Sequence, residues 1–149
     1  MNDYKYSDAG LELTKGFESL RLIAYPDPGT GGAPWTVGYG HTGDDVFESL
    51  VITESQADQW LIEDTDKAAD HVKRLVTVEL TQNQFDALVD FVFNCGAENL
   101  AKSTLLKLVN AKRFEEAAKQ FQEWVHAGGR ILPGLVKRRY QEAALFSDN

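Results

Sequence analysis

Residues 16–42 read GFESLRLIAYPDPGTGGAPWTVGYGHT, and this segment is the most informative part of the sequence for the fold. Strand-forming residues stand in two runs on either side of a turn-rich segment, Leu22, Ile23 and Tyr25 before it and Trp35, Val37 and Tyr39 after it. The segment between them, residues 26–34, is PDPGTGGAP, and its prolines and glycines favour turns. We therefore predict a small antiparallel sheet with a long connection, which must lie against helices to bury its apolar side.

A first helix is predicted just before this stretch. Ser7 can cap its N-terminus, and Leu11, Thr14 and Glu18 are spaced along one side of it. Glu18 then lies at the C-terminal end, where a carboxylate opposes the helix dipole. Because a carboxylate is unfavourable at the end of a helix, Glu18 is a candidate for a functional role.

The rest of the chain has helical signals. Capping boxes at Thr53-x-x-Gln56 and Thr81-x-x-Gln84 each predict a helix, the first long enough to connect two lobes and the second ending at Gly96. Shorter helices are expected over three further ranges, residues 104–111, 114–126 and 133–146, with Gly128-Gly129 as a break between the last two.

These elements predict an α+β fold in a single domain of residues 1–149. A small antiparallel sheet lobe is expected over about residues 20–50. A larger helical lobe is expected over about residues 55–146 together with the N-terminal helix. A cleft between the lobes, which the long helix joins, is the natural place for a binding site.

Composition limits the partners. The chain has 15 basic and 23 acidic residues, a net charge of −8, which argues against nucleic acid and against stable binding to anionic membranes. Lys137, Arg138 and Arg139 form a local basic cluster, expected to be a solvated helix face. The single cysteine, Cys95, is expected to be a buried free thiol. The N-terminus lacks the apolar core of a secretory signal, so synthesis in the cytoplasm is expected.

Glu18 and Asp27 are candidates for paired carboxylate chemistry. Hydrolysis of a glycosidic bond needs one acid to protonate the leaving oxygen and a second group to activate water or stabilise the sugar cation. A helix end and a loop after a strand can face each other across a cleft. Since the chain has 23 acidic residues, this pairing alone is a weak signal.

The surrounding motifs make the signal specific. The front third contains Gly16-Phe17-Glu18, Ala24-Tyr25-Pro26-Asp27 and Trp35-Thr36-Val37-Gly38-Tyr39-Gly40-His41-Thr42, and it resembles the phage-type lysozymes, glycoside hydrolase family 24. The resemblance continues, in the same order, through three later motifs: Ala87-Leu88-Val89-x-Phe91-x-Phe93-Asn94-x-Gly96, Ser103-Thr104-Leu105-Leu106 and Gly134-Leu135-x-x-Arg138-Arg139-x-x-Glu142. It covers residues 10–146.

The resemblance implies roles for three residues. Glu18 is the general acid and has to be protonated. Asp27 is the second carboxylate, as base or as nucleophile, and Thr36 positions the attacking water or supports Asp27. Residues 30–34 make the loop between Asp27 and Thr36 longer than in the shortest members of the family, which can shift Asp27.

The other motif residues are candidates for binding or structural roles. Tyr25 and Tyr39 can stack on sugar rings, Asn94 can bind a sugar or a buried backbone group, and Arg138 or its neighbour can reach the active-site acid. His41 is expected to be a hydrogen-bonded structural residue, because no second metal ligand stands at suitable spacing. No metal or other cofactor is expected.

The resemblance implies a phage endolysin. Such a muramidase cuts the β-1,4 bond between N-acetylmuramic acid and N-acetylglucosamine in bacterial peptidoglycan and causes host lysis. A monomer is expected, released to the periplasm and cell wall with the help of a holin. Two alternatives remain, a lysozyme-like domain that only binds peptidoglycan or a protein partner, and a lytic transglycosylase that works without Asp27.

Overall fold

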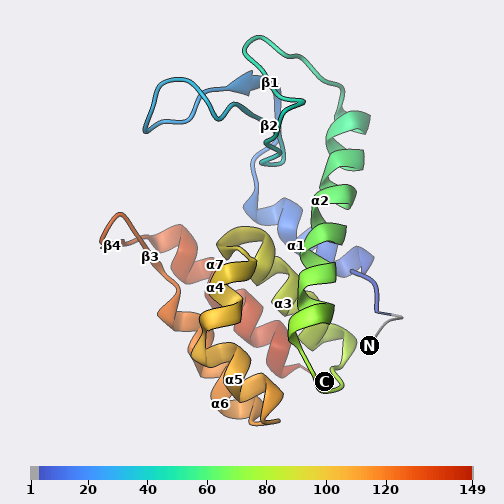
Figure 1. The fold of residues 1–149 in the computed structure, drawn as a ribbon, viewed down its shortest axis with the longest axis vertical. Coiled ribbons are helices and arrows are strands. Elements are labelled where there is room, and N and C mark those ends of the chain that lie inside the picture. Colours follow the sequence, from blue (N-terminus) through green and yellow to red (C-terminus); the bar gives the residue numbers. More distant parts are fainter. Residues whose placement is uncertain (1–3, 149) are drawn as a thin grey trace. The chain divides into compact units, whose positions relative to one another are not determined.

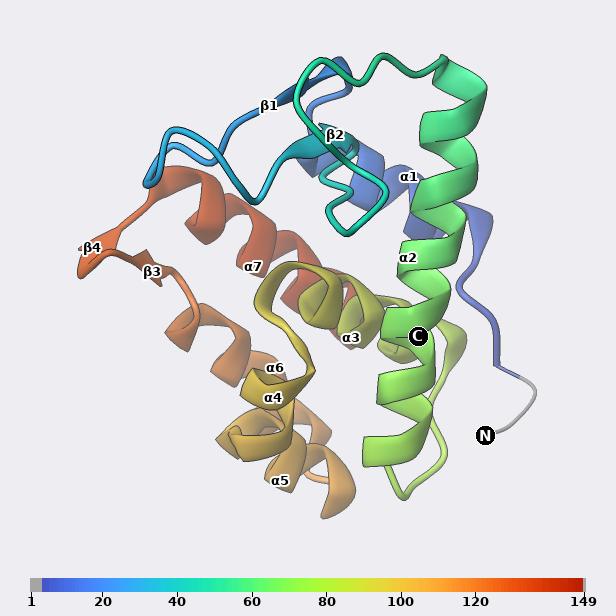
Figure 2. The same cartoon turned by 45° about the horizontal axis from the view of Figure 1, so that its top comes forward.

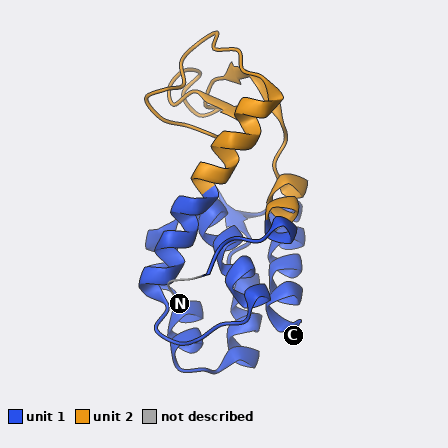
Figure 3. Cartoon of the chain, turned by 90° about the vertical axis from the view of Figure 1, so that its right-hand side faces the viewer, with its two compact units in different colours: residues 1–10, 65–149 blue, residues 11–64 orange. Residues whose placement is uncertain are grey.

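The computed structural model describes residues 4–148, which divide into two compact units (Figure 3). One unit is Leu11–Asp64, and the other contains residues 4–10 and 65–148. Two helices, α1 (Asp8–Phe17) and α2 (Glu54–Leu75), have residues in both units. Most of α1 clusters with the sheet unit, whereas the sequence assigned it to the helical lobe.

The Leu11–Asp64 unit contains the predicted sheet. Strands β1 (Arg21–Tyr25) and β2 (Thr36–Gly38) pair antiparallel, with Tyr25 opposite Thr36. Its small core consists of buried Ala24, Val37 and Val46, packed against partly buried Trp35, Leu50, Ile52 and Trp60. Two short strands bury little surface by themselves, and here the rings of Trp35 and Trp60 pack against their buried residues.

The other unit is helical. Its helices are α3 (Gln82–Cys95), α4 (Ala97–Lys102), α5 (Thr104–Asn110), α6 (Phe114–Gln120) and α7 (Pro133–Ser147), with a 3₁₀ turn at Phe121–Glu123. Residues 84–92 of α3 are all buried, and α7 lies alongside α3 in both views (Figures 1 and 2). A helix that is buried all round is the centre of its core, and α3 has that place here.

The capping predictions are confirmed at Ser7 and Thr81, whereas at Thr53 only one bond of the predicted box is formed, from the Gln56 N–H to the Thr53 hydroxyl at 3.1 Å. The Ser7 hydroxyl accepts a hydrogen bond from the Gly10 N–H at 3.0 Å, so it caps α1. The side chain and backbone of Thr81 form both hydrogen bonds of a capping box with Gln84, and α3 ends at Gly96. Each capping contact joins residues that lie within three positions of each other in the chain, so the sequence alone can predict it.

The helix predicted over residues 114–126 is wrong in length. It ends at Gln120, and the chain then forms a hairpin of β3 (His126–Ala127) and β4 (Arg130–Ile131). The two residues between the strands, Gly128 and Gly129, have φ values of 59° and 78°. Two consecutive positive φ values define the tight turn that suits a two-residue hairpin. The glycine pair is therefore a turn within a hairpin and not merely a break between helices. The short helix α4 was also missed.

Within residues 4–148, none of the helices combines the length and the apolar character that a membrane crossing requires.

Candidate active site

Glu18 follows directly after α1. Its backbone N–H donates to the carbonyl of buried Thr14 at 3.0 Å, which continues the last helical turn and fixes the Glu18 backbone. The Glu18 side chain is half-buried. The sequence predicted this position at a helix end, although it assigned the helix to the helical lobe and Glu18 belongs to the Leu11–Asp64 unit.

A glycine turn packs against the Glu18 carboxylate. Val37 and His41 exchange two backbone hydrogen bonds, of 3.0 and 2.8 Å, which close the turn that contains Gly40. Gly40 has φ +83°, and a Cβ atom at this position would lie 3.2 Å from Oε1 of Glu18. Glycine is therefore favoured here for two reasons, the left-handed backbone and the close approach to the carboxylate.

His41 anchors this turn. It is buried, with Nδ1 2.7 Å from Oδ2 of Asp64 and Nε2 3.0 Å from Oδ1 of Asp45. Its ring stacks on Trp60 at a centroid distance of 4.2 Å. The prediction of a structural, hydrogen-bonded His41 is confirmed. Among residues 4–148, no group of three or more His, Cys, Asp or Glu side chains is arranged to hold a metal ion.

Asp27 is held by its own loop. Its Oδ2 accepts hydrogen bonds from the backbone N–H groups of Gly29 at 3.0 Å and Thr30 at 3.1 Å. Its backbone N–H donates to the Gly32 carbonyl at 2.9 Å, and its carbonyl accepts from the Gly31 N–H at 2.8 Å. This is the turn chemistry of an aspartate before a proline and glycines. The carboxylate is thus fixed relative to the backbone of the loop.

The remaining predicted residues of this unit lie on the two strands and the glycine turn. Thr36 begins β2 and is half-buried opposite Tyr25, whose ring lies 4.6 Å from the Arg21 guanidinium. Tyr39 belongs to the glycine turn, with Nζ of Lys15 5.7 Å from its ring centroid. Glu18, Asp27, Thr36, Tyr25 and Tyr39 all belong to the Leu11–Asp64 unit.

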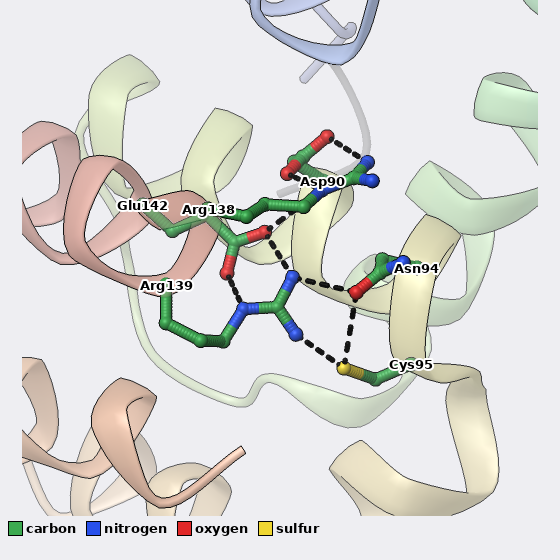
Figure 4. A network of polar contacts seen from close by, with 6 residues as sticks. All are labelled: Asp90, Asn94, Cys95, Arg138, Arg139 and Glu142. Atoms are coloured by element: carbon green, nitrogen blue, oxygen red, sulfur yellow. Dashed lines mark hydrogen bonds and ion pairs between the residues drawn. The ribbon is translucent and has the colours of Figure 1, made fainter. Parts of the chain in front are cut away.

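Arg138 and Arg139 belong to the helical unit, and the expectation of a solvated basic face is wrong for both. Arg138 is 4% exposed and Arg139 is 0% exposed, and only Lys137 of the cluster is exposed. A buried guanidinium needs carboxylate partners, and Figure 4 shows them. Arg138 donates to both oxygens of Asp90, at 2.9 and 2.8 Å, and Arg139 contacts both oxygens of Glu142, at 2.7 and 2.9 Å.

This network shifts the pKa of two of its members. Burial raises the pKa of Glu142 well above its ordinary value, and neighbouring Asp90 adds to the rise while Arg139 and Arg138 oppose it. Burial also raises the pKa of the Cys95 thiol, against the effect of Arg139. Cys95 is a free, half-buried cysteine whose sulfur lies 2.5 Å from Nη1 of Arg139. A thiol with a raised pKa is a poor nucleophile, so Cys95 is the free thiol expected from the sequence, although it is half-buried and not buried.

Asn94, predicted to contact sugar, is exposed and belongs to the same network. Its Oδ1 accepts a hydrogen bond from Nη2 of Arg139 at 2.8 Å (Figure 4). The sequence analysis missed the partners Asp90 and Glu142. For Glu142 a signal was present, because Arg-Arg-x-x-Glu places a carboxylate one helical turn after two cations. Asp90 is 48 residues from Arg138, and no local pattern links them.

Known proteins share much of this sequence. The chain is 46% identical to the endolysin of Bacillus phage B103 over 94% of its length, and it spans 53% of that relative. It is 42% identical to the endolysin of Acyrthosiphon pisum secondary endosymbiont phage 1, covering 94% of this chain and 96% of the relative. The chain thus spans about half the length of the Bacillus phage relative but nearly all of the second.

Solved structures extend the likeness to the fold. The muramidase domain of SpmX from Asticaccaulis excentricus is 41% identical, with a TM-score of 0.89 over 98% of this chain and 99% of that one. The model of the phage lysozyme family matches residues 15–142, which include Glu18, Asp27, Thr36 and the Arg138–Glu142 network. The chain belongs to the phage lysozyme family.

Proposed function

We propose that this chain is an endolysin that hydrolyses the β-1,4 bond between N-acetylmuramic acid and N-acetylglucosamine in peptidoglycan. The observation that supports it most is the position of Glu18, a half-buried carboxylate at a helix end, against which a glycine turn packs so closely that a Cβ atom at position 40 would lie 3.2 Å from Oε1. A proton donor needs such a fixed position relative to the bond that it cleaves.

The proposed reaction assigns one task to each group. Glu18 donates its proton to the glycosidic oxygen as the bond from that oxygen to the sugar C1 breaks. Water supplies the new oxygen at C1, and its proton is accepted by a carboxylate. Asp27 acts either as the base for this water or as a nucleophile that forms the first bond to C1. The Thr36 hydroxyl orients the water or supports Asp27.

Substrate contacts are proposed for four further residues. Tyr25 and Tyr39 present aromatic rings in the same unit as Glu18, and rings of this kind can pack on sugar faces. Asn94 has an exposed amide whose oxygen is already bonded to Arg139. The pairing of Arg138 with Asp90 favours a role in joining α7 to α3, and its contact with substrate stays a prediction.

The endolysin names of relatives support peptidoglycan as the partner. Synthesis in the host cytoplasm, dependence on a holin and a monomeric state stay predictions of the family resemblance.

Mass spectrometry of purified peptidoglycan after digestion tests the proposal against both alternatives. Hydrolysis releases fragments with reducing N-acetylmuramic acid ends, which is the expected result. Fragments with 1,6-anhydro ends would indicate a lytic transglycosylase. Binding to peptidoglycan without release of fragments would indicate a binding domain.

A further inference from the structure

The loop between β1 and β2 is folded around Thr30. The Thr30 hydroxyl donates to the Ala33 carbonyl at 2.7 Å and accepts from the Gly32 N–H at 3.2 Å. The Thr30 N–H donates to Oδ2 of Asp27 at 3.1 Å. Thr30 therefore ties the Asp27 carboxylate, through its backbone, to the far side of the loop, through its side chain.

The same contacts make the two oxygens of Asp27 unequal. Oδ2 accepts from the N–H groups of Gly29 and Thr30. Oδ1 accepts no hydrogen bond from any of residues 4–148. A carboxylate held through one oxygen has a fixed orientation, and its other oxygen stays available for a reacting group.

We propose that Thr30 and Gly29 are positioning residues for Asp27, which fix its carboxylate through Oδ2 so that Oδ1 alone acts in the reaction. This inference rests on the proposed role of Asp27. It gives the long loop a function, because residues 30–33 supply the hydroxyl and the backbone groups that close the loop around the carboxylate.

The glycines of the loop provide a matched test of this assignment. A Cβ atom at Gly29 would lie 3.0 Å from Oδ2 of Asp27, so alanine there has to displace the carboxylate. A Cβ atom at Gly32 would meet no atom within 4 Å, and the hydrogen bonds of Gly32 use its backbone, which alanine keeps. Gly29→Ala and Gly32→Ala thus add the same methyl group to the same loop, with and without contact to Asp27.

The experiment measures kcat and KM separately on soluble peptidoglycan fragments. Thr30→Val removes the hydroxyl but keeps the branched side chain, and Thr30→Ser restores the hydroxyl. Since a misplacement of about 1 Å can cost about a hundredfold, we expect Thr30→Val and Gly29→Ala to lower kcat about tenfold or more. KM should stay within about threefold. Thr30→Ser and Gly32→Ala should stay within about twofold of wild type in both constants.

Asp27→Ala separates the failure of this inference from the failure of the proposed function. If Asp27→Ala is inactive while Thr30→Val and Gly29→Ala keep the kcat of wild type, the positioning role is overturned and Asp27 stands. An equal loss in Gly29→Ala and Gly32→Ala would also overturn it, because the effect would then belong to the loop in general. If Asp27→Ala itself stays within tenfold of wild type, the role of Asp27 fails and the inference fails with it.

Discussion

Gly40→Ala should damage catalysis more than it damages the fold. The substitution places a methyl carbon 3.2 Å from Oε1 of Glu18, a contact that forces one of the two groups to move by a few tenths of an ångström. If about 1 Å of misplacement costs about a hundredfold, a shift of this size corresponds to a loss of about fivefold to tenfold in kcat.

The same substitution also strains the backbone. An alanine at φ +83° costs about 1–2 kcal/mol, because its Cβ crowds the carbonyl oxygen. For a chain of this size that loss lowers Tm by about 2–8 °C. The strain by itself changes the population of folded protein very little at 25 °C, so a loss of kcat measured there reports on Glu18.

Gly129→Ala is the control. Gly129 has φ +78°, and a Cβ atom there would meet no atom within 4 Å, so it repeats the strain without the contact to Glu18. Calorimetry should give a similar fall in Tm for the two variants, and turnover assays at 25 °C should show a loss of kcat only in Gly40→Ala. If Gly40→Ala and Gly129→Ala have the same kcat, the idea that the turn around Gly40 positions the Glu18 carboxylate is refuted.

Three further predictions concern other parts of the chain. Thr36→Val should lower kcat by about a hundredfold, the scale for loss of a positioned water. Thr36→Ser keeps a hydroxyl and should recover most of the lost kcat. An active Thr36→Val would exclude the hydroxyl from the reaction. The folded state raises the pKa of Glu142 above its ordinary value of 4.5. The stability that Glu142 contributes is therefore full below pH 4.5 and is lost as pH rises through the folded-state pKa. The Tm of wild type minus the Tm of Glu142→Gln should shrink as pH rises, and a difference that grows would contradict this direction. With a net charge of −8 and only Lys137 of the basic cluster exposed, lysis of isolated peptidoglycan should rise or stay flat between about 0.01 and 0.1 M salt, and a steep fall would point to a cationic wall-binding surface.

The sequence predicted those features that local chemistry determines. Ser7 and Thr81 mark helix starts because a side chain two or three residues from an unpaired N–H group can satisfy it. The two strands and their connection follow from residues 21–39. Glu18 and Asp27 became candidates because the motifs around them are contiguous in the chain.

Features that depend on distant residues were not predicted. Arg138 looks like part of a solvated basic face until Asp90, from α3, is placed beside it. His41 was expected to be structural, yet its partner Asp64 lies 23 residues away and could not be named in advance. The hairpin at residues 126–131 was missed because its strands are two residues each, too short for any alternation of polar and apolar side chains to be visible.

The central claim, that Glu18 is the acid that cleaves the glycan strand, is tested most directly by the rate at which new reducing ends appear in purified peptidoglycan. Glu18→Gln keeps the size of the side chain and removes the transferable proton, and Glu12→Gln makes the same change at an exposed position of α1. We predict that Glu18→Gln loses at least about a hundredfold in this rate, the lower end of the range for general acid catalysis, while Glu12→Gln stays within about twofold of wild type. A folded Glu18→Gln protein that releases reducing ends within about tenfold of the wild-type rate would contradict the account.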